Sequence, residues 1–153
     1  MLFRSMCPQV KVYCVDISDD ALEYTRKNKE LLCCDNVTVV KADILEGTSF
    51  IGLPRPDIIL SNPPYIRSSE IPSLQKEVHF EPKLALDGGD DGLVFYRQLS
   101  EIWYPLINRG GYLAMECGEE QADDILSLFL EKAEKGRVVK DAAGLDRVVI
   151  IKR

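Results

Sequence analysis

Residues 10–22, VKVYCVDISDDAL, predict the fold most directly, because a strand pattern runs straight into the start of a helix. Val10 to Asp16 is largely apolar and contains β-branched and aromatic side chains, which is typical of a strand buried on both faces. Ser18 then stands where a helix N-cap is expected, followed by acidic residues that favour the positive end of a helix. The stretch predicts a strand followed at once by a helix.

Outward from this stretch, strands and helices continue to alternate. Further strands are predicted at Val37–Lys41, Asp57–Ser61 and Tyr112–Cys117, and further helices over residues 93–107 and 119–135. The last strands, Arg137–Lys140 and Arg147–Lys152, have no helix between them and should be antiparallel neighbours. The predicted fold class is therefore α/β, with a mostly parallel sheet covered on both faces and an antiparallel carboxyl-terminal pair.

Length, composition and charge indicate one globular domain, predicted to span residues 1–153. The formal net charge of −6 argues against nucleic acid as the main partner, because nucleic-acid-binding domains usually carry a basic patch. The cysteines lack the spacing of a zinc site, so no metal is expected and a reducing compartment is indicated. No apolar run reaches the length of a membrane span. A cytoplasmic protein without a membrane partner is predicted.

In parallel sheets with helical crossovers, ligands bind beyond the carboxyl ends of the strands. Asp16 ends a strand and could accept hydrogen bonds from the ribose hydroxyls of a nucleoside cofactor, but it could equally help Ser18 to cap the helix. Asp43 could accept a hydrogen bond from an adenine amino group, with Ile44 packed on the ring, although an ordinary loop aspartate is the simpler interpretation. On spacing alone, both alternatives stay open at each aspartate.

Asn62-Pro63-Pro64-Tyr65 follows another predicted strand and is the most informative motif. The side-chain carbonyl of Asn62 and the main-chain carbonyl of Pro63 could accept both hydrogens of a planar amide or aromatic amine, while Tyr65 packs on the flat group. Such nitrogens are poor nucleophiles, and fixed acceptors stabilise the positive charge that develops as the nitrogen attacks a methyl donor. A proline-rich strand exit with a hydrogen-bonding asparagine remains the simpler alternative. The single histidine, His79, is interpreted as a polar loop residue.

These residues resemble the protein release factor glutamine N5-methyltransferases, also called HemK-type enzymes, and the similarity spans nearly the whole chain. Besides Asn62 to Tyr65 it includes Phe80-Glu81-Pro82, Ala85-Leu86-Asp87-Gly88-Gly89, Asp91-Gly92-Leu93, Phe95-Tyr96-Arg97, Gly110-Gly111-Tyr112 and the segment from Ala143 to Val149. This combination is more specific than the tetrapeptide, which is shared with enzymes that methylate amino groups of DNA and RNA bases.

The resemblance implies a Rossmann-like S-adenosylmethionine-dependent methyltransferase fold. It also implies transfer of a methyl group from S-adenosylmethionine to the glutamine in the Gly-Gly-Gln loop of peptide chain release factors. By position, Asp16 is the implied ribose-binding acid, and Asp43 with Ile44 forms the implied adenine contacts. Asn62 to Tyr65 are the implied catalytic and substrate-binding residues, with Asn62 also touching the cofactor.

The chain departs from the family pattern at its beginning. Family members have a first strand and a glycine-rich turn before the strand that ends at the ribose-binding acid, and a small helical domain before both. Met1 to Gln9 instead resemble part of the helix that follows the glycine-rich turn in family members. We therefore expect an incomplete catalytic domain that lacks the first strand and glycine-rich turn. Strands without their shared neighbour have exposed edges, so weak cofactor binding and self-association are expected.

Two other functions stay open on the sequence. The tetrapeptide would suit an amino-group methyltransferase acting on adenine in RNA or DNA, which the acidic balance and the other motifs disfavour. The missing glycine-rich turn would suit a noncatalytic remnant of the fold.

Overall fold

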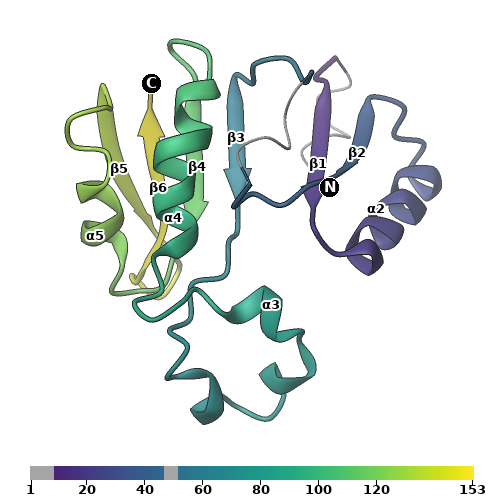
Figure 1. Ribbon diagram of the computed structural model, residues 1–153. Helices are drawn as coiled ribbons and strands as arrows, with labels where there is room; N and C mark the ends of the chain where they lie inside the picture. Colours follow the sequence, from purple (N-terminus) through teal and green to yellow (C-terminus); the bar gives the residue numbers. More distant parts are fainter. Residues whose placement is uncertain (1–8, 47–51) are drawn as a thin grey trace. The chain divides into compact units, whose positions relative to one another are not determined.

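The computed structural model describes residues 9–46 and 52–153 (Figure 1). These residues form two compact units, the first ending at Gly52 and the second beginning at Leu53. The features predicted before residue 9 and the loop at Gly47 lie outside the described residues, as does the side chain of His79. The prediction of one domain over residues 1–153 stays a prediction. None of the helices in the described ranges has the length and apolar character of a membrane-crossing segment.

The first unit is a parallel strand pair joined by a helix. It consists of β1 (Val12–Asp16), α2 (Asp19–Leu31) and β2 (Val37–Lys41). The two strands pair in parallel up to Asp16 opposite Lys41, and α2 packs on both strands. Ser18 caps α2 by accepting a hydrogen bond from the Ala21 N–H at 3.3 Å, and Leu22 on the buried side of the helix is 1% exposed. The predicted strands, cap and helix are confirmed.

The second unit contains a mixed sheet with its own order. Its strands are β3 (Ile58–Ser61), β4 (Tyr112–Glu116), β5 (Lys135–Lys140) and β6 (Asp146–Lys152). They are arranged in the order β3-β4-β6-β5, with β3 and β4 parallel and β6 antiparallel to both of its neighbours. The predicted antiparallel carboxyl-terminal pair is confirmed, and its last strand lies between β4 and β5.

One face of this sheet forms the core of the second unit. Its side chains from β4 and β6 are fully buried and comprise Leu113, Met115, Val149 and Ile151. The helix predicted over residues 93–107 forms as three consecutive helical pieces, α4 (Val94–Gln98), a π-helical turn (Leu99–Trp103) and a 3-10 turn (Tyr104–Leu106). Tyr96 of α4 is fully buried, and its hydroxyl donates to the Glu116 carbonyl at the end of β4 at 2.7 Å. This bond joins the helix to the sheet.

The last helix is shorter than predicted. α5 (Ala122–Ser127) forms only part of the helix expected over residues 119–135. Lys135 and Gly136, which resemble a helix end in sequence, begin β5 because this segment pairs with β6. A β-carbon at Gly136 would lie 2.6 Å from Leu126 Cδ2. A larger residue here would displace the Leu126 side chain where α5 packs on β5, and the glycine does not terminate a helix.

The prediction of strands buried on both faces is wrong for both units. In the first unit, every residue of β1 is only partly buried. In the second unit, one side of the sheet is exposed at β3. Opposite the core, Ile58 and Leu60 of β3 are 52% and 65% exposed, and Tyr112 of β4 is 41% exposed. Apolar content predicts a strand but does not reveal which faces other elements cover. Among the described residues, β1 pairs with β2 alone and β3 with β4 alone, as expected for strands without a shared neighbour.

The long segment between β3 and α4 contains short helical turns. These are η1 (Ile71–Ser73), η2 (Val78–Phe80) and α3 (Lys83–Leu86). Figure 1 shows the segment leaving the carboxyl end of β3 and returning to the start of α4. The predicted Asn-Pro-Pro-Tyr motif is the beginning of this segment.

Candidate functional site

Asp16 and Asp43 lie at the same edge of the sheet in the first unit. Asp16 ends β1 opposite Lys41 of β2, and Asp43 follows shortly after Lys41 in the chain. The Ala42 N–H donates to the main-chain carbonyl of Asp16 at 3.0 Å, which joins the two strand ends. The structure thus brings the predicted cofactor-binding acids, with the adjacent Ile44, to one carboxyl edge.

Each of these carboxylates binds a nearby main-chain N–H through one oxygen. Asp16 Oδ1 accepts from Ser18 at 2.9 Å, and Asp43 Oδ1 accepts from Leu45 at 2.8 Å. Asp16 therefore supports the start of α2, as one of its two interpretations predicted. Among the described residues, no hydrogen bond occupies the second oxygen of either carboxylate. Support of the helix start and ligand binding are therefore compatible at Asp16.

Asn62 to Tyr65 follow β3 directly, at the carboxyl end of the parallel β3–β4 pair. Asn62 is exposed, Pro63 is buried and Tyr65 is half-buried. Exposure leaves the Asn62 amide accessible to a ligand, while the buried proline restricts the main chain that carries its carbonyl. The predicted motif is therefore a stiff strand exit with an exposed asparagine.

A glycine turn packs against Tyr65. A β-carbon at Gly88 would lie 2.8 Å from Tyr65 Cα, and one at Gly92, whose φ is +74°, would lie 2.6 Å from the Tyr65 carbonyl oxygen. The Ile66 N–H donates to the Leu86 carbonyl at 3.0 Å, and the Gly88 N–H donates to the Ile66 carbonyl at 2.8 Å. Glycines in the family motifs thus allow the strand exit to lie against the turn before α4.

Asp87 stabilises the same turn through its side chain. Its Oδ1 accepts from the Ser68 hydroxyl at 2.6 Å and from the Gly89 N–H at 3.0 Å. The hydrogen bond from Ser68, followed by that from Gly89, lowers the pKa of the Asp87 carboxyl group. The charged carboxylate thereby links the segment after the motif to the glycine turn.

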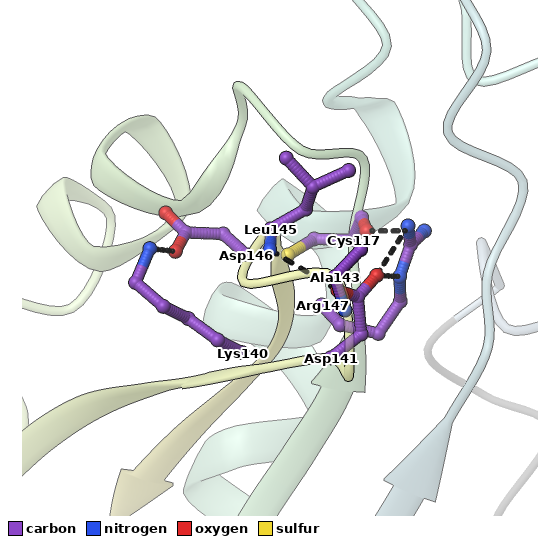
Figure 2. A network of polar contacts seen from close by, with 7 residues as sticks. All are labelled: Cys117, Lys140, Asp141, Ala143, Leu145, Asp146 and Arg147. Carbon is purple, nitrogen blue, oxygen red and sulfur yellow. Dashed lines mark hydrogen bonds and ion pairs between the residues drawn. The ribbon is translucent and has the colours of Figure 1, made fainter.

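In the hairpin between β5 and β6, the carboxylate of Asp141 binds the guanidinium of Arg147 (Figure 2). Arg147 donates to Asp141 Oδ2 from Nε at 3.4 Å and from Nη2 at 3.2 Å, and to the Cys117 carbonyl from Nη1 at 3.5 Å. Asp141 Oδ1 accepts from the Ala143 and Leu145 main-chain N–H groups at 2.9 and 3.1 Å. Hydrogen bonds, chiefly that from Leu145, lower the pKa of Asp141. The ionised carboxylate orients the guanidinium.

Arg147 also lies beside the Tyr65 hydroxyl. Burial raises the pKa of Tyr65 and the charge of Glu116 raises it further, whereas the charge and hydrogen bond of Arg147 lower it. The fold thus brings the motif at residues 143–149 to the side chain that ends the Asn62–Tyr65 motif.

Sequence reasoning missed two residues that contact Tyr65. Arg147 lies in a family motif, but its distance from Tyr65 along the chain hides the contact. Gln121, which donates to the Tyr65 carbonyl at 3.0 Å, has no motif signal at all. The predicted site residues form two groups, Asp16, Asp43 and Ile44 in the first unit and Asn62, Pro63, Pro64 and Tyr65 in the second.

The chain is similar to curated methyltransferases over most of its length. It is 38% identical over 147 residues to a release factor glutamine methyltransferase of Clostridium acetobutylicum, covering 94% of this chain and 51% of that protein. The release factor glutamine methyltransferase of Caulobacter vibrioides is also 38% identical over 147 residues, with coverage of 94% and 50%. The chain therefore spans about half the length of the curated relatives it matches. No protein family model matches it.

Solved structures agree with this similarity. A methyltransferase from Pyrococcus furiosus has a TM-score of 0.69 at 21% identity, covering 98% of this chain and 66% of that one, and shows the fold. The release-factor-specific protein-(glutamine-N5) methyltransferase from Alicyclobacillus acidocaldarius has a TM-score of 0.51 at 27% identity, covering 93% and 78%. The predicted Rossmann-like methyltransferase fold is confirmed, and over nearly its whole length the chain is similar to the release factor glutamine methyltransferases.

Proposed function

We propose that this chain is the catalytic portion of a protein-glutamine N-methyltransferase. It transfers a methyl group from S-adenosylmethionine to the glutamine in the Gly-Gly-Gln loop of peptide chain release factors. The observation that carries the proposal is the exposed Asn62 at the end of β3, followed by a buried proline. The 38% identity to a protein named release factor glutamine methyltransferase supports the same reaction and substrate.

Asp16, Asp43 and Ile44 are proposed to bind the adenosyl part of S-adenosylmethionine. Ribose hydroxyls and the adenine amino group are hydrogen-bond donors, and each carboxylate has one oxygen without a hydrogen bond from the described residues. These acids therefore suit the groups that they would bind, and Ile44 supplies an apolar contact for the ring. Bound S-adenosylmethionine supplies an electrophilic methyl group, and Asn62 is proposed to contact it as well.

The Asn62 side-chain carbonyl and the Pro63 main-chain carbonyl are proposed to accept the N–H groups of the substrate glutamine. Proline restricts rotation of the main chain, so the Pro63 carbonyl keeps its direction. As the glutamine nitrogen becomes positively charged, its N–H groups become stronger donors. The acceptors therefore bind the transition state more tightly than the ground state. Tyr65 packs against the planar amide.

This segment could accelerate the reaction by orienting the glutamine nitrogen toward the methyl group, and a strong base is not required. In the proposed reaction the glutamine nitrogen would take the methyl group as its bond to sulfur breaks, and the nitrogen would then lose a proton to water. Correct placement of reacting groups lowers a barrier by up to about 7–11 kcal/mol. The stiff strand exit at Pro63 and Pro64 suits such placement.

The isolated chain is proposed to self-associate through the open side of β3. Ile58 and Leu60 are 52% and 65% exposed on this strand, and its second edge has no strand partner among the described residues. Exposed apolar strand edges favour pairing between molecules. Sedimentation at several concentrations tests this expectation, and a monomer throughout would contradict it.

Replacement of Asn62 by alanine tests the proposed reaction. The assay measures transfer from methyl-labelled S-adenosylmethionine to a release factor with its Gly-Gly-Gln loop. We expect N62A to reduce turnover about a hundredfold or more, because an acceptor that strengthens in the transition state is lost. Asn28→Ala on the exposed side of α2 is the matched control and should leave turnover within about twofold.

Unchanged turnover in N62A would contradict the proposed role of the asparagine. Binding of S-adenosylmethionine without any transfer by the unaltered chain would favour the noncatalytic remnant. Label appearing on adenine of RNA or DNA, but not on the release factor, would favour the amino-group alternative.

A further inference from the structure

Gln121 is a buried polar side chain whose complete amide is hydrogen-bonded. It is 9% exposed and belongs to the segment of the chain that connects β4 to α5. Its Nε2 donates to the Tyr65 carbonyl at 3.0 Å and to the Gly92 carbonyl at 3.3 Å, and its Oε1 accepts from the Gly118 N–H at 3.0 Å. One side chain thus joins the exit of β3, the turn before α4 and the exit of β4.

Only an uncharged primary amide matches this arrangement of partners. A glutamine side chain offers two donors and an acceptor in one plane, which corresponds to two carbonyl groups and one N–H. A carboxylate in the same place would face two carbonyl oxygens, and an apolar side chain would leave buried main-chain groups without partners. The chemistry of the contacts therefore requires glutamine at position 121, although the sequence around it carries no motif.

The neighbouring glycines leave the space that the amide occupies. A β-carbon at Gly92 would lie 2.6 Å from Gln121 Nε2, and one at Gly118 would lie 3.0 Å from Gln121 Oε1. The Gly92 β-carbon would also lie 2.6 Å from the Tyr65 carbonyl oxygen. The close packing leaves little room for Tyr65 to move relative to the amide.

We propose that Gln121 is a positioning residue for the methyl transfer, which holds the main chain of Tyr65 and so fixes the direction of the Pro63 carbonyl. This inference rests on the proposed function. Pro64 stands between the two residues, and its ring restricts the rotation that would otherwise uncouple them. Gln121 itself touches neither reacting group. It acts through the segment that does.

Amide hydrogen exchange of the 153-residue chain tests the tether independently of catalysis. The informative N–H groups belong to Ile66, Ser68 and Gly88, which bind carbonyls in the segment held by Gln121. We expect Gln121→Met, which keeps the length of the side chain but removes its donors, to accelerate their exchange about tenfold. Exchange in β5 and β6 should stay unchanged.

Gln98→Met is the matched control. Gln98 Oε1 is buried without a hydrogen-bond partner among the described residues, so the same substitution there breaks no bond made by that oxygen. Exchange at Ile66, Ser68 and Gly88 should match that of the unaltered chain. Unchanged exchange in Gln121→Met, or equal acceleration throughout the second unit, would overturn the proposed local tether.

A pH profile separates positioning from a general loss of stability. Gln121→Glu should lower kcat about tenfold or more at neutral pH, where the carboxylate repels the Tyr65 and Gly92 carbonyls, with KM for S-adenosylmethionine within about twofold. Acidification protonates the new side chain, which can then donate one hydrogen bond again. The ratio of its kcat to that of the unaltered chain should therefore rise as the pH falls, and a pH-independent ratio would overturn the inference.

The exchange and kinetic experiments distinguish failure of this inference from failure of the proposed function. If the unaltered chain transfers no methyl group, the proposed function fails. Amide hydrogen exchange in the Gln121→Met variant then still decides whether Gln121 holds the main chain of Tyr65. If transfer occurs and Gln121→Met retains full kcat, the positioning role fails alone.

Discussion

The two strand exits that carry the predicted site are held in place in different ways. At the exit of β1, Asp16 binds the main-chain N–H of Ser18 at 2.9 Å, only two residues further along the chain. At the exit of β3, Tyr65 is bound by Gln121, which is 56 residues away in sequence, and it lies beside the more distant Arg147. Local hydrogen bonds position the first exit, whereas tertiary packing positions the second. Substitutions should therefore have local effects at β1 and wider effects at β3.

Gly92→Ala should produce the largest effect on stability and would show how tightly the β3 exit is packed. A β-carbon there meets both Gln121 Nε2 and the Tyr65 carbonyl oxygen at 2.6 Å, and φ is +74°. We expect a loss of about 2–5 kcal/mol in the free energy of unfolding, from steric overlap and backbone strain together. Denaturant titration measures this loss.

Gly144→Ala is the control for strain alone. Gly144 has a similar φ of +84°, but a β-carbon there would meet nothing within 4 Å. Gly144→Ala should lower the free energy of unfolding by about 1–2 kcal/mol. Equal losses for the two substitutions would mean that the glycine turn is not closely packed against Tyr65.

A pair of substitutions at the β1 exit should separate ligand binding from helix capping. Asp16→Asn keeps an oxygen for the Ser18 N–H but loses the negative charge, so we expect affinity for S-adenosylmethionine to fall about tenfold. Ser18→Ala removes the cap of α2 and should cost about 1 kcal/mol of stability with unchanged affinity. Calorimetric titration and thermal melting measure the two effects. Equal affinity in Asp16→Asn and the unaltered chain would leave Asp16 with its capping role alone.

Acid should weaken the second unit through Asp141, and this is the smallest of the predicted effects. Hydrogen bonds, first from Leu145 and then from Arg147, lower the pKa of Asp141 in the folded chain. A group with a lowered pKa stabilises the fold above its unfolded value, near pH 4, and this contribution is lost as the pH falls through the folded value. Asp141→Asn should therefore flatten the dependence of melting temperature on pH in this range. Parallel curves for the two chains would contradict the prediction.

The secondary structure was predicted well where its signals are local. Ser18 and the acids after it are adjacent in sequence, and the structure contains the capped helix that they predict. The end of α5 was misjudged because Lys135 and Gly136 are compatible with a helix end in isolation. Their pairing with β6, together with the close approach of Leu126, makes them part of a strand.

The candidate site was only partly predictable for a similar reason. Asn62 to Tyr65 are consecutive and lie at a predicted strand end, so their placement follows from a short pattern. Gln121 has no neighbouring signal, because its function depends on carbonyls from Tyr65 and Gly92 that reach it only in the folded chain. Exposure of Ile58 was equally hidden, since apolar content does not show which elements cover a strand.

By itself, the sequence determined the alternation of strands and helices and the position of each acid or asparagine at a strand end. These features depend on residues that are near one another in the chain and on the steric limits of proline and glycine. Tertiary structure alone decided that Gln121 and Arg147 meet Tyr65 from two later segments. Hydrogen bonds between distant segments need donors and acceptors to be brought into the same place, and only packing of the sheet and its helices does this.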